Sequence, residues 1–171
     1  NATDGSIVSD LWDGYGNDWI FEVAWSNDGS LVFCGGGDSA VTRFHTNNWT
    51  EDNNISGLGG WVSGIETTPD DRLVFFTSNT NVLGYWVENN TPYYFMDNHS
   101  AYVRVIAISP DGRYLATGSQ DNYVIITEIA TKQIIAEIDL GGQVHDIDFS
   151  SDGGSMLVTR GFGDTFYIYR T

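Results

Sequence analysis

The chain has 171 residues, of which 41% are hydrophobic and 14% aromatic, a composition typical of a globular domain with a substantial core. Its 23 acidic side chains outnumber the 7 basic ones and give a formal net charge of −16, which repels phosphate backbones and anionic lipid headgroups. Nucleic acid and membrane surfaces are therefore poor candidates for partners, and no apolar run approaches the length that spans a bilayer.

Four short turn-forming segments divide the chain at nearly even intervals. In chain order they are Ser26-Asn27-Asp28-Gly29, Thr68-Pro69-Asp70-Asp71, Ser109-Pro110-Asp111-Gly112 and Ser150-Ser151-Asp152-Gly153. Their second residues, at 27, 69, 110 and 151, are 42, 41 and 41 positions apart. A fixed period of about 40 to 45 residues with four strands in each unit is the signature of β-propeller blades.

Short apolar runs flank each of these turns and indicate strands, because β-branched and aromatic residues are bounded by turn formers. The first strands are expected to begin near Ile20, Val62, Val103 and Val144. A second apolar run follows each turn, at 31–34, 73–76, 114–117 and 155–158. Outer strands are expected at 49–55, 93–96 and 133–138.

We therefore predict an all-β fold, a propeller with four blades of four antiparallel strands. The whole of 1–171 is expected to form a single domain. Its blades are expected at about 18–60, 61–101, 102–142 and 143–171.

The fourth repeat reaches Thr171 without an outer strand of its own. The segment 6–12 is strand-like, carries Ile7, Val8 and Leu11, and leads through an acidic, Gly-rich loop into the first repeat. We predict that this N-terminal strand completes the last blade, because closure removes an exposed sheet edge. The strand comes either from the same chain or from a neighbouring one. In the second case two chains close a ring, or successive chains build a filament head to tail.

These repeats resemble the WD-repeat (WD40-type) β-propeller family, most closely over 103–119, which is followed by Asp121 at the family's turn aspartate. The resemblance implies that four residues cap the equivalent tight turns with a side-chain oxygen: Asp38, Asn81, Asp121 and Asp164. The family's terminal Trp-Asp pair is represented only by Trp86, and its Gly-His pair ahead of the first strand is absent.

The residue immediately before each predicted first strand is aromatic in three of the four repeats. These residues are Trp19, Trp61, Tyr102 and Gln143. The repeat places them at equivalent positions on one rim of the central channel, where rings offer stacking surface to a peptide, a sugar or a cation. The alternative is that they pack between neighbouring blades.

The sequence carries no recognised catalytic or metal-binding motif. His45, His99 and His145 fall at different positions in their repeats, and HExxH, paired CxxC, GxSxG and P-loop patterns are all absent. We therefore expect a protein that is not an enzyme and has no metal or cofactor. The resemblance implies a protein-interaction scaffold.

Five acceptor patterns for N-glycosylation lie before residue 101. They begin at Asn1, Asn48, Asn54, Asn89 and Asn98. The single cysteine, Cys34, cannot form an intrachain disulfide and suits the cytoplasm, whereas the acceptor patterns favour secretion. We expect an extracellular glycoprotein, with a cytoplasmic protein as the alternative. In that setting the second functional hypothesis is a structural subunit that self-assembles as a homo-oligomer through strand 6–12.

Overall fold

The computed structural model describes residues 19–161 and 166–170. Regular secondary structure in these residues consists of fifteen β-strands, so the described part of the chain holds no helix that could cross a bilayer. The N-terminal strand predicted at 6–12, with Ile7, Val8 and Leu11, lies outside the described residues.

The strands form four antiparallel sheets that follow the chain order, and we call these sheets blades one to four. Blade one contains β1 (Ile20–Trp25), β2 (Leu31–Gly36), β3 (Val41–His45) and β4 (Thr50–Ile55). Blade two contains β5 (Ile65–Thr67), β6 (Leu73–Ser78), β7 (Asn81–Trp86) and β8 (Pro92–Met96). Blade three contains β9 (Val103–Ile108), β10 (Tyr114–Ser119), β11 (Tyr123–Glu128) and β12 (Gln133–Asp139). Blade four contains β13 (Val144–Phe149), β14 (Ser155–Arg160) and β15 (Phe166–Arg170).

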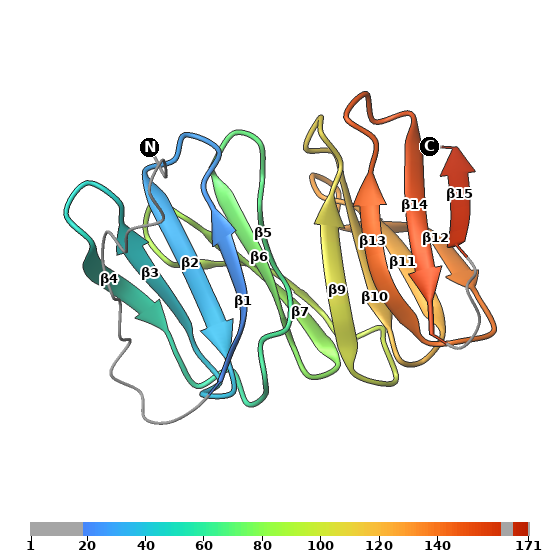
Figure 1. Ribbon diagram of the computed structural model, residues 1–171, viewed down its shortest axis with the longest axis horizontal. Helices are drawn as coiled ribbons and strands as arrows, with labels where there is room; N and C mark the ends of the chain where they lie inside the picture. Colours follow the sequence, from blue (N-terminus) through green and yellow to red (C-terminus); the bar gives the residue numbers. More distant parts are fainter. Residues whose placement is uncertain (1–18, 162–165, 171) are drawn as a thin grey trace, which may run out of the picture.

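The blades stand side by side in the order of the sequence, from β1–β4 at one end to β13–β15 at the other (Figure 1). The first strands of successive blades contact one another, β1 with β5, β5 with β9 and β9 with β13. The prediction of an all-β propeller with four consecutive blades is confirmed.

The turn between the first and second strands of each blade has one repeated hydrogen-bond pattern. In blade three, Ser109 Oγ donates to Asp111 Oδ1 at 2.7 Å and accepts from Tyr114 N at 2.9 Å. Gly112 closes the turn with a φ of 72°, a conformation that favours glycine. The Asp111 carboxyl accepts hydrogen bonds from the Ser109 hydroxyl and from amides of the turn, and these bonds hold its pKa below the usual range. Ser26, Thr68 and Ser150 repeat the hydroxyl-to-carboxylate bond in the other blades.

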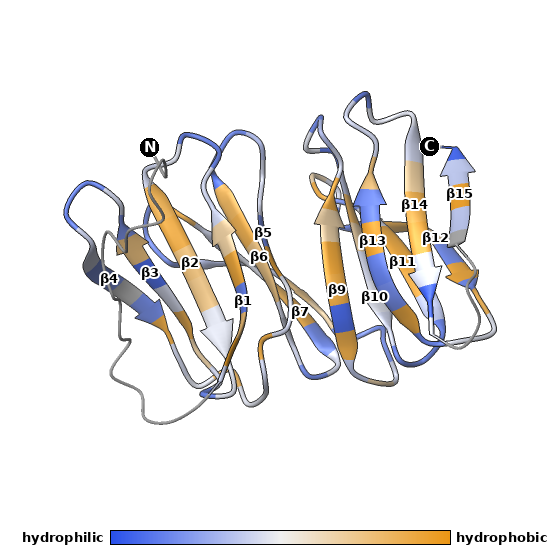
Figure 2. Ribbon diagram, viewed as in Figure 1, coloured by the Kyte–Doolittle hydropathy of each residue, from blue (hydrophilic) through white to orange (hydrophobic). Residues whose placement is uncertain are grey.

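The core lies between the blades as three apolar clusters, one at each internal boundary. Figure 2 shows the corresponding concentration of hydrophobic residues in the strands, for example in β2 and β9. Two glycines allow neighbouring blades to approach closely. A Cβ at Gly35 would overlap Val62, and one at Gly118 would overlap Val144. The small residues in the second strands therefore fix the spacing of these blades.

Candidate functional site

Three aromatic side chains gather on the edge of the molecule where β1 begins, and we call them the rim cluster. Trp19 is 77% exposed and Trp61 is 56% exposed. Phe21 lies between them, with its ring centroid 6.5 Å from that of Trp19 and 5.7 Å from that of Trp61. Both tryptophan rings are mostly in solvent, so packing between blades does not account for them. Exposed contiguous apolar surface of this kind is typical of interaction sites.

The four predicted rim residues share one backbone contact. Each accepts a hydrogen bond through its carbonyl oxygen from the turn between the second and third strands of its own blade. The donor amides belong to Gly37, Asn79, Gln120 and Gly161, at distances of 2.9, 3.4, 2.9 and 2.9 Å. Their side chains differ, since Tyr102 and Gln143 are half-buried and make no part of the rim cluster. The structure therefore joins Trp19 and Trp61 through Phe21, which the sequence did not single out.

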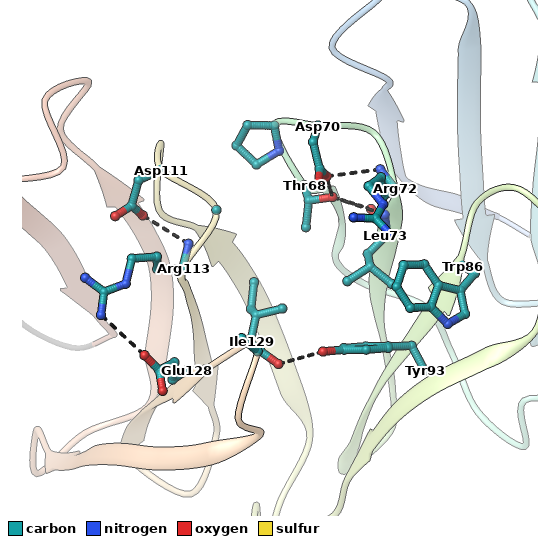
Figure 3. Close-up of a pocket in the computed structure, with 13 residues that line it drawn as sticks. Thr68, Asp70, Arg72, Leu73, Trp86, Tyr93, Asp111, Arg113, Glu128 and Ile129 are labelled. Atoms are coloured by element: carbon teal, nitrogen blue, oxygen red, sulfur yellow. Dashed lines mark hydrogen bonds and ion pairs between the residues drawn. The ribbon is translucent and has the colours of Figure 1, made fainter.

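A groove of about 330 Å³ lies between blades two and three (Figure 3). It is lined by turns at the edge of the blades opposite the start of β1 (Figure 1). Its floor is apolar and includes Leu73 and Ile129. Tyr93 Oη donates to the carbonyl oxygen of Ile129 at 2.9 Å and so ties the two blades together beneath it. The guanidinium of Arg72 lies 5.3 Å from the ring centroid of Trp86. This groove can accept an apolar side chain of a partner.

The far wall of the groove carries an exposed ion pair. Arg113 Nη2 lies 3.3 Å from Glu128 Oε1, and the Arg113 side chain is mostly exposed. The hydrogen bond from Thr131 to Glu128, together with Arg113, holds the pKa of the Glu128 carboxyl below its usual range. The groove lining thus combines two arginines, Arg72 and Arg113, with three carboxylates: Asp70, Asp111 and Glu128.

Acidic side chains line the inner strands of the blades. Burial raises the pKa of Glu66 on β5 to about 7, and the carboxylates of Glu22 and Asp148 contribute to the same effect. Arg104 and His145 lie on the same inner surface. No three His, Cys, Asp or Glu side chains within residues 19–161 and 166–170 are placed to share a metal ion.

Three polar side chains of blade three, His99, Thr117 and Asp121, form a buried hydrogen-bonded triad that the sequence pattern did not indicate. His99 Nδ1 lies 2.9 Å from Asp121 Oδ2, and Nε2 of the same ring lies 2.8 Å from Thr117 Oγ1. Asp121 also accepts from the amides of Tyr123 at 3.0 Å and Ser100 at 2.9 Å. Burial alone would raise the pKa of Asp121, but these hydrogen bonds outweigh it and hold the pKa below its usual range.

The other predicted turn residues are placed differently. Asp38 Oδ1 accepts from Ala40 N at 3.3 Å, which is a turn cap of the predicted kind. Asn81 is the first residue of β7 and its Oδ1 accepts from Thr80 Oγ1 at 3.4 Å, while the residue with positive φ in that turn is Asn79. Asp164 lies outside the described residues.

The family model described as WD domain, G-beta repeat, matches residues 5–42 and 90–127. These two stretches of the chain are WD40 repeats. The second matched stretch contains the whole of the His99, Thr117 and Asp121 triad.

Among curated WD40 relatives, the small ribosomal subunit protein RACK1y of Oryza sativa subsp. japonica is 25% identical over 125 residues, 71% of this chain and 33% of the relative. The ribosome biogenesis protein BOP1 homolog of Leishmania braziliensis is 39% identical over 51 residues, 30% of this chain and 7% of the relative. BOP1 of Mus musculus is 33% identical over 70 residues, 41% of this chain and 10% of the relative. The chain thus spans a third or less of these relatives.

The prediction of a secreted, extracellular protein is wrong. The relatives of this WD40 chain are ribosomal or ribosome-biogenesis proteins, which are intracellular, and they point away from secretion. The five Asn-x-Ser/Thr patterns therefore do not indicate a secreted protein.

Two of these patterns have a structural use in the WD40 blades. Asn48 Oδ1 accepts from the amide and hydroxyl of Thr50 at 3.1 and 2.8 Å, and Asn89 Oδ1 accepts from those of Thr91 at 3.1 and 2.6 Å. The same Asn-x-Thr turn therefore connects the third and fourth strands in blades one and two. Asn54 lies within β4, Asn98 is exposed ahead of β9, and Asn1 lies outside the described residues.

Proposed function

We propose that this chain is a non-catalytic protein-interaction scaffold that binds a protein partner through the rim cluster of Trp19, Phe21 and Trp61. The observation that carries the proposal is the exposure of two tryptophans that contact the same phenylalanine ring on one edge of the blades. Aromatic side chains provide large contact areas with little loss of conformational entropy and dominate the binding energy of many interfaces. WD40 propellers mostly act as such interaction platforms.

Charge favours a protein partner over a nucleic acid. The net charge of −16 opposes contact with a phosphate backbone, and neutralising phosphates requires basic clusters. The names of the relatives refer to the small ribosomal subunit and to ribosome biogenesis. We infer for this chain an intracellular assembly in which it contacts a protein component rather than RNA.

The second hypothesis, a self-assembling subunit with an exchanged N-terminal strand, rests on Ile7, Val8 and Leu11, outside the described residues. The comparisons give no support to a secreted structural role. Tyr102 and Gln143 remain candidate contacts at the periphery of the rim because their backbone positions match those of Trp19 and Trp61.

Selection of a displayed peptide library on the folded chain tests the proposal. Peptides bound by the wild type are expected to lose affinity for the Trp19→Ala and Trp61→Ala variants by roughly tenfold or more, as truncated aromatic anchors do. Phe95→Ala is the matched control, because Phe95 on β8 is 57% exposed and lies away from the rim cluster. Equal loss in all three variants, or no loss in either tryptophan variant, would contradict the proposal.

A further inference from the structure

The rim cluster presents aromatic faces to solvent and carries no charge of its own. Trp61 precedes the first strand of blade two, which has blade one on one side and blade three on the other, and its side chain is still 56% exposed. The face of a tryptophan ring attracts the cation of a lysine or arginine more strongly than a phenylalanine or tyrosine face does. Whether the cluster selects an apolar or a cationic side chain therefore depends on the charges around it.

The loops on the edge that carries the rim cluster are acidic. They join the second strand to the third in each blade, and the outer strand to the first strand of the next blade, at the edge where the first strands begin (Figure 1). In the described part of the chain these loops contain no lysine or arginine, and their acidic residues are Asp38, Asp97 and Asp121. The loops of the opposite edge carry both signs of charge, with Arg72, Arg113 and Lys132 as their basic residues.

The arginines of the two blades that form the rim cluster lie elsewhere. Residues 19–96 contain nine acidic side chains and two arginines, Arg43 and Arg72. Arg43 is 6% exposed, and its guanidinium lies 2.6 Å from Asp52 Oδ2. Arg72 lies in the groove at the opposite edge. The cation that the tryptophan faces can attract is therefore not supplied by blades one and two.

Two carboxylates adjoin the rim cluster. Asp38 lies in the turn whose Gly37 amide donates to the carbonyl oxygen of Trp19 at 2.9 Å. Glu22 lies on β1, directly after the phenylalanine that joins the two tryptophans. Burial raises the pKa of the Glu22 carboxyl, and the carboxylate of Asp146 adds to the effect. A cation at this edge would meet negative charge and would stabilise the ionised form of Glu22.

We propose that the rim cluster binds a basic segment of a protein partner, with an arginine or lysine side chain against the faces of Trp19 and Trp61. This inference rests on the proposed function, because it names the chemistry of the partner for the same site. The tryptophan faces hold the cation, and the surrounding carboxylates select a positively charged segment over a neutral or acidic one.

Three displayed peptide libraries test the inference. They share random apolar positions and differ only at fixed positions, which carry arginine, glutamine or glutamate. The tightest binders of each library are titrated against the wild type at low and at high ionic strength. The arginine peptides are expected to bind at least about tenfold more tightly than the glutamate peptides. This advantage is expected to shrink with added salt, because salt screens exposed charges.

Two substitutions separate binding at the rim cluster from general attraction to an acidic chain. Trp61→Leu keeps an apolar side chain but removes the ring, and is expected to weaken the arginine peptides roughly tenfold. Phe95→Leu is its matched control, because Phe95 on β8 is 57% exposed. Asp38→Asn keeps the turn-capping oxygen and is expected to weaken the same peptides roughly threefold at low salt. Glu88→Gln removes one charge from the opposite edge and is expected to have little effect.

The outcomes distinguish this inference from the proposed function. Peptides that depend on Trp61 but show no preference for arginine would overturn the inference and leave the proposed function standing. Peptides that prefer arginine but are unaffected by substitution of Trp19 and Trp61 would show only general attraction and would overturn both. Failure of all three libraries to yield a binder would also overturn both.

Discussion

The imidazole Nδ1 of His99 lies 2.9 Å from a carboxylate oxygen of Asp121, and both side chains are buried. The pair joins the loop ahead of β9 to the turn between β10 and β11, and Thr117 holds the second ring nitrogen. Blade three is thus tied across its width by polar contacts. In blades two and four the equivalent positions carry Leu58 and Leu140, which pack in the apolar clusters instead.

Replacing His99 with alanine is expected to lower the free energy of unfolding by about 2 to 4 kcal/mol, because it removes the buried hydrogen bonds of the ring to Asp121 and Thr117 and leaves a cavity in place of the ring. Urea denaturation measures the change. His45→Ala is the control, since the His45 side chain is 43% exposed and its pair with Asp52 is partly accessible to solvent. The free energy of unfolding of that variant is expected to fall by less than about 1 kcal/mol. An equal fall in both variants would contradict a stabilising role of the triad.

Glu66→Gln is expected to stabilise the chain at neutral and alkaline pH. The folded pKa of about 7 lies above the ordinary value of 4.5, so the folded state binds its proton more tightly and loses stability as the pH rises between these values. The variant removes this loss, which is worth about 2 kcal/mol above pH 7 after allowance for solvent screening.

Melting temperatures of the wild type and Glu66→Gln across this pH range provide the measurement. The two curves are expected to converge below pH 4.5 and to separate above pH 7. Glu137→Gln, at an exposed position on β12, is the control and is expected to follow the wild type. A Glu66→Gln curve parallel to the wild type at every pH would refute the assignment.

Gly118→Ala is expected to destabilise the boundary between blades three and four by about 1 to 3 kcal/mol, because the added Cβ overlaps Val144. A second substitution, Val144→Ala, removes the Cγ1 atom that lies nearest to the added Cβ and is expected to make the two changes non-additive. Thermal unfolding of the single and double variants gives the coupling. Gly154→Ala, which meets only the exposed side chain of Asp152, serves as the control, and simple additivity would rule out the steric explanation.

The Asn-x-Thr turn at Asn89 is expected to depend on a side-chain oxygen and not on a glycan. Asn89→Ala removes the acceptor for both Thr91 bonds and is expected to cost about 1 kcal/mol. Asn89→Asp keeps an acceptor and is expected to retain most of the stability while abolishing the glycosylation pattern. Denaturation of unglycosylated protein compares the two. A larger loss in the aspartate variant than in the alanine variant would contradict the turn role.

The repeat period and the strand pattern were sufficient to predict four consecutive β-blades, because turn residues and apolar runs act locally. The first strand expected to begin near Val103 does begin there, as β9, and the outer strand expected at 133–138 corresponds to β12. Contacts between distant residues were harder to predict. His99 is 18 residues from Thr117 and 22 from Asp121. Because Asn98 stands where the family has glycine, the family's Gly-His pair is not recognisable in the sequence.

Exposure could not be derived from residue type at all. Ile20 and Val23 repeat the apolar pattern of β5, β9 and β13, yet they are exposed because burial depends on whether another blade lies against them. Trp19 and Trp61 likewise had two possible uses, and only the three-dimensional arrangement brings them together around Phe21.

The carbonyl contact shared by the four rim residues has a consequence for how this edge can change. The main chain at Trp19, Trp61, Tyr102 and Gln143 is anchored through its carbonyl oxygen atoms, so this hydrogen bond does not depend on the side chain. At the exposed positions Trp19 and Trp61, mutation can therefore sample new chemistry with little penalty in stability. This edge is a natural place to graft designed recognition residues, and one where related chains can diverge in what they bind.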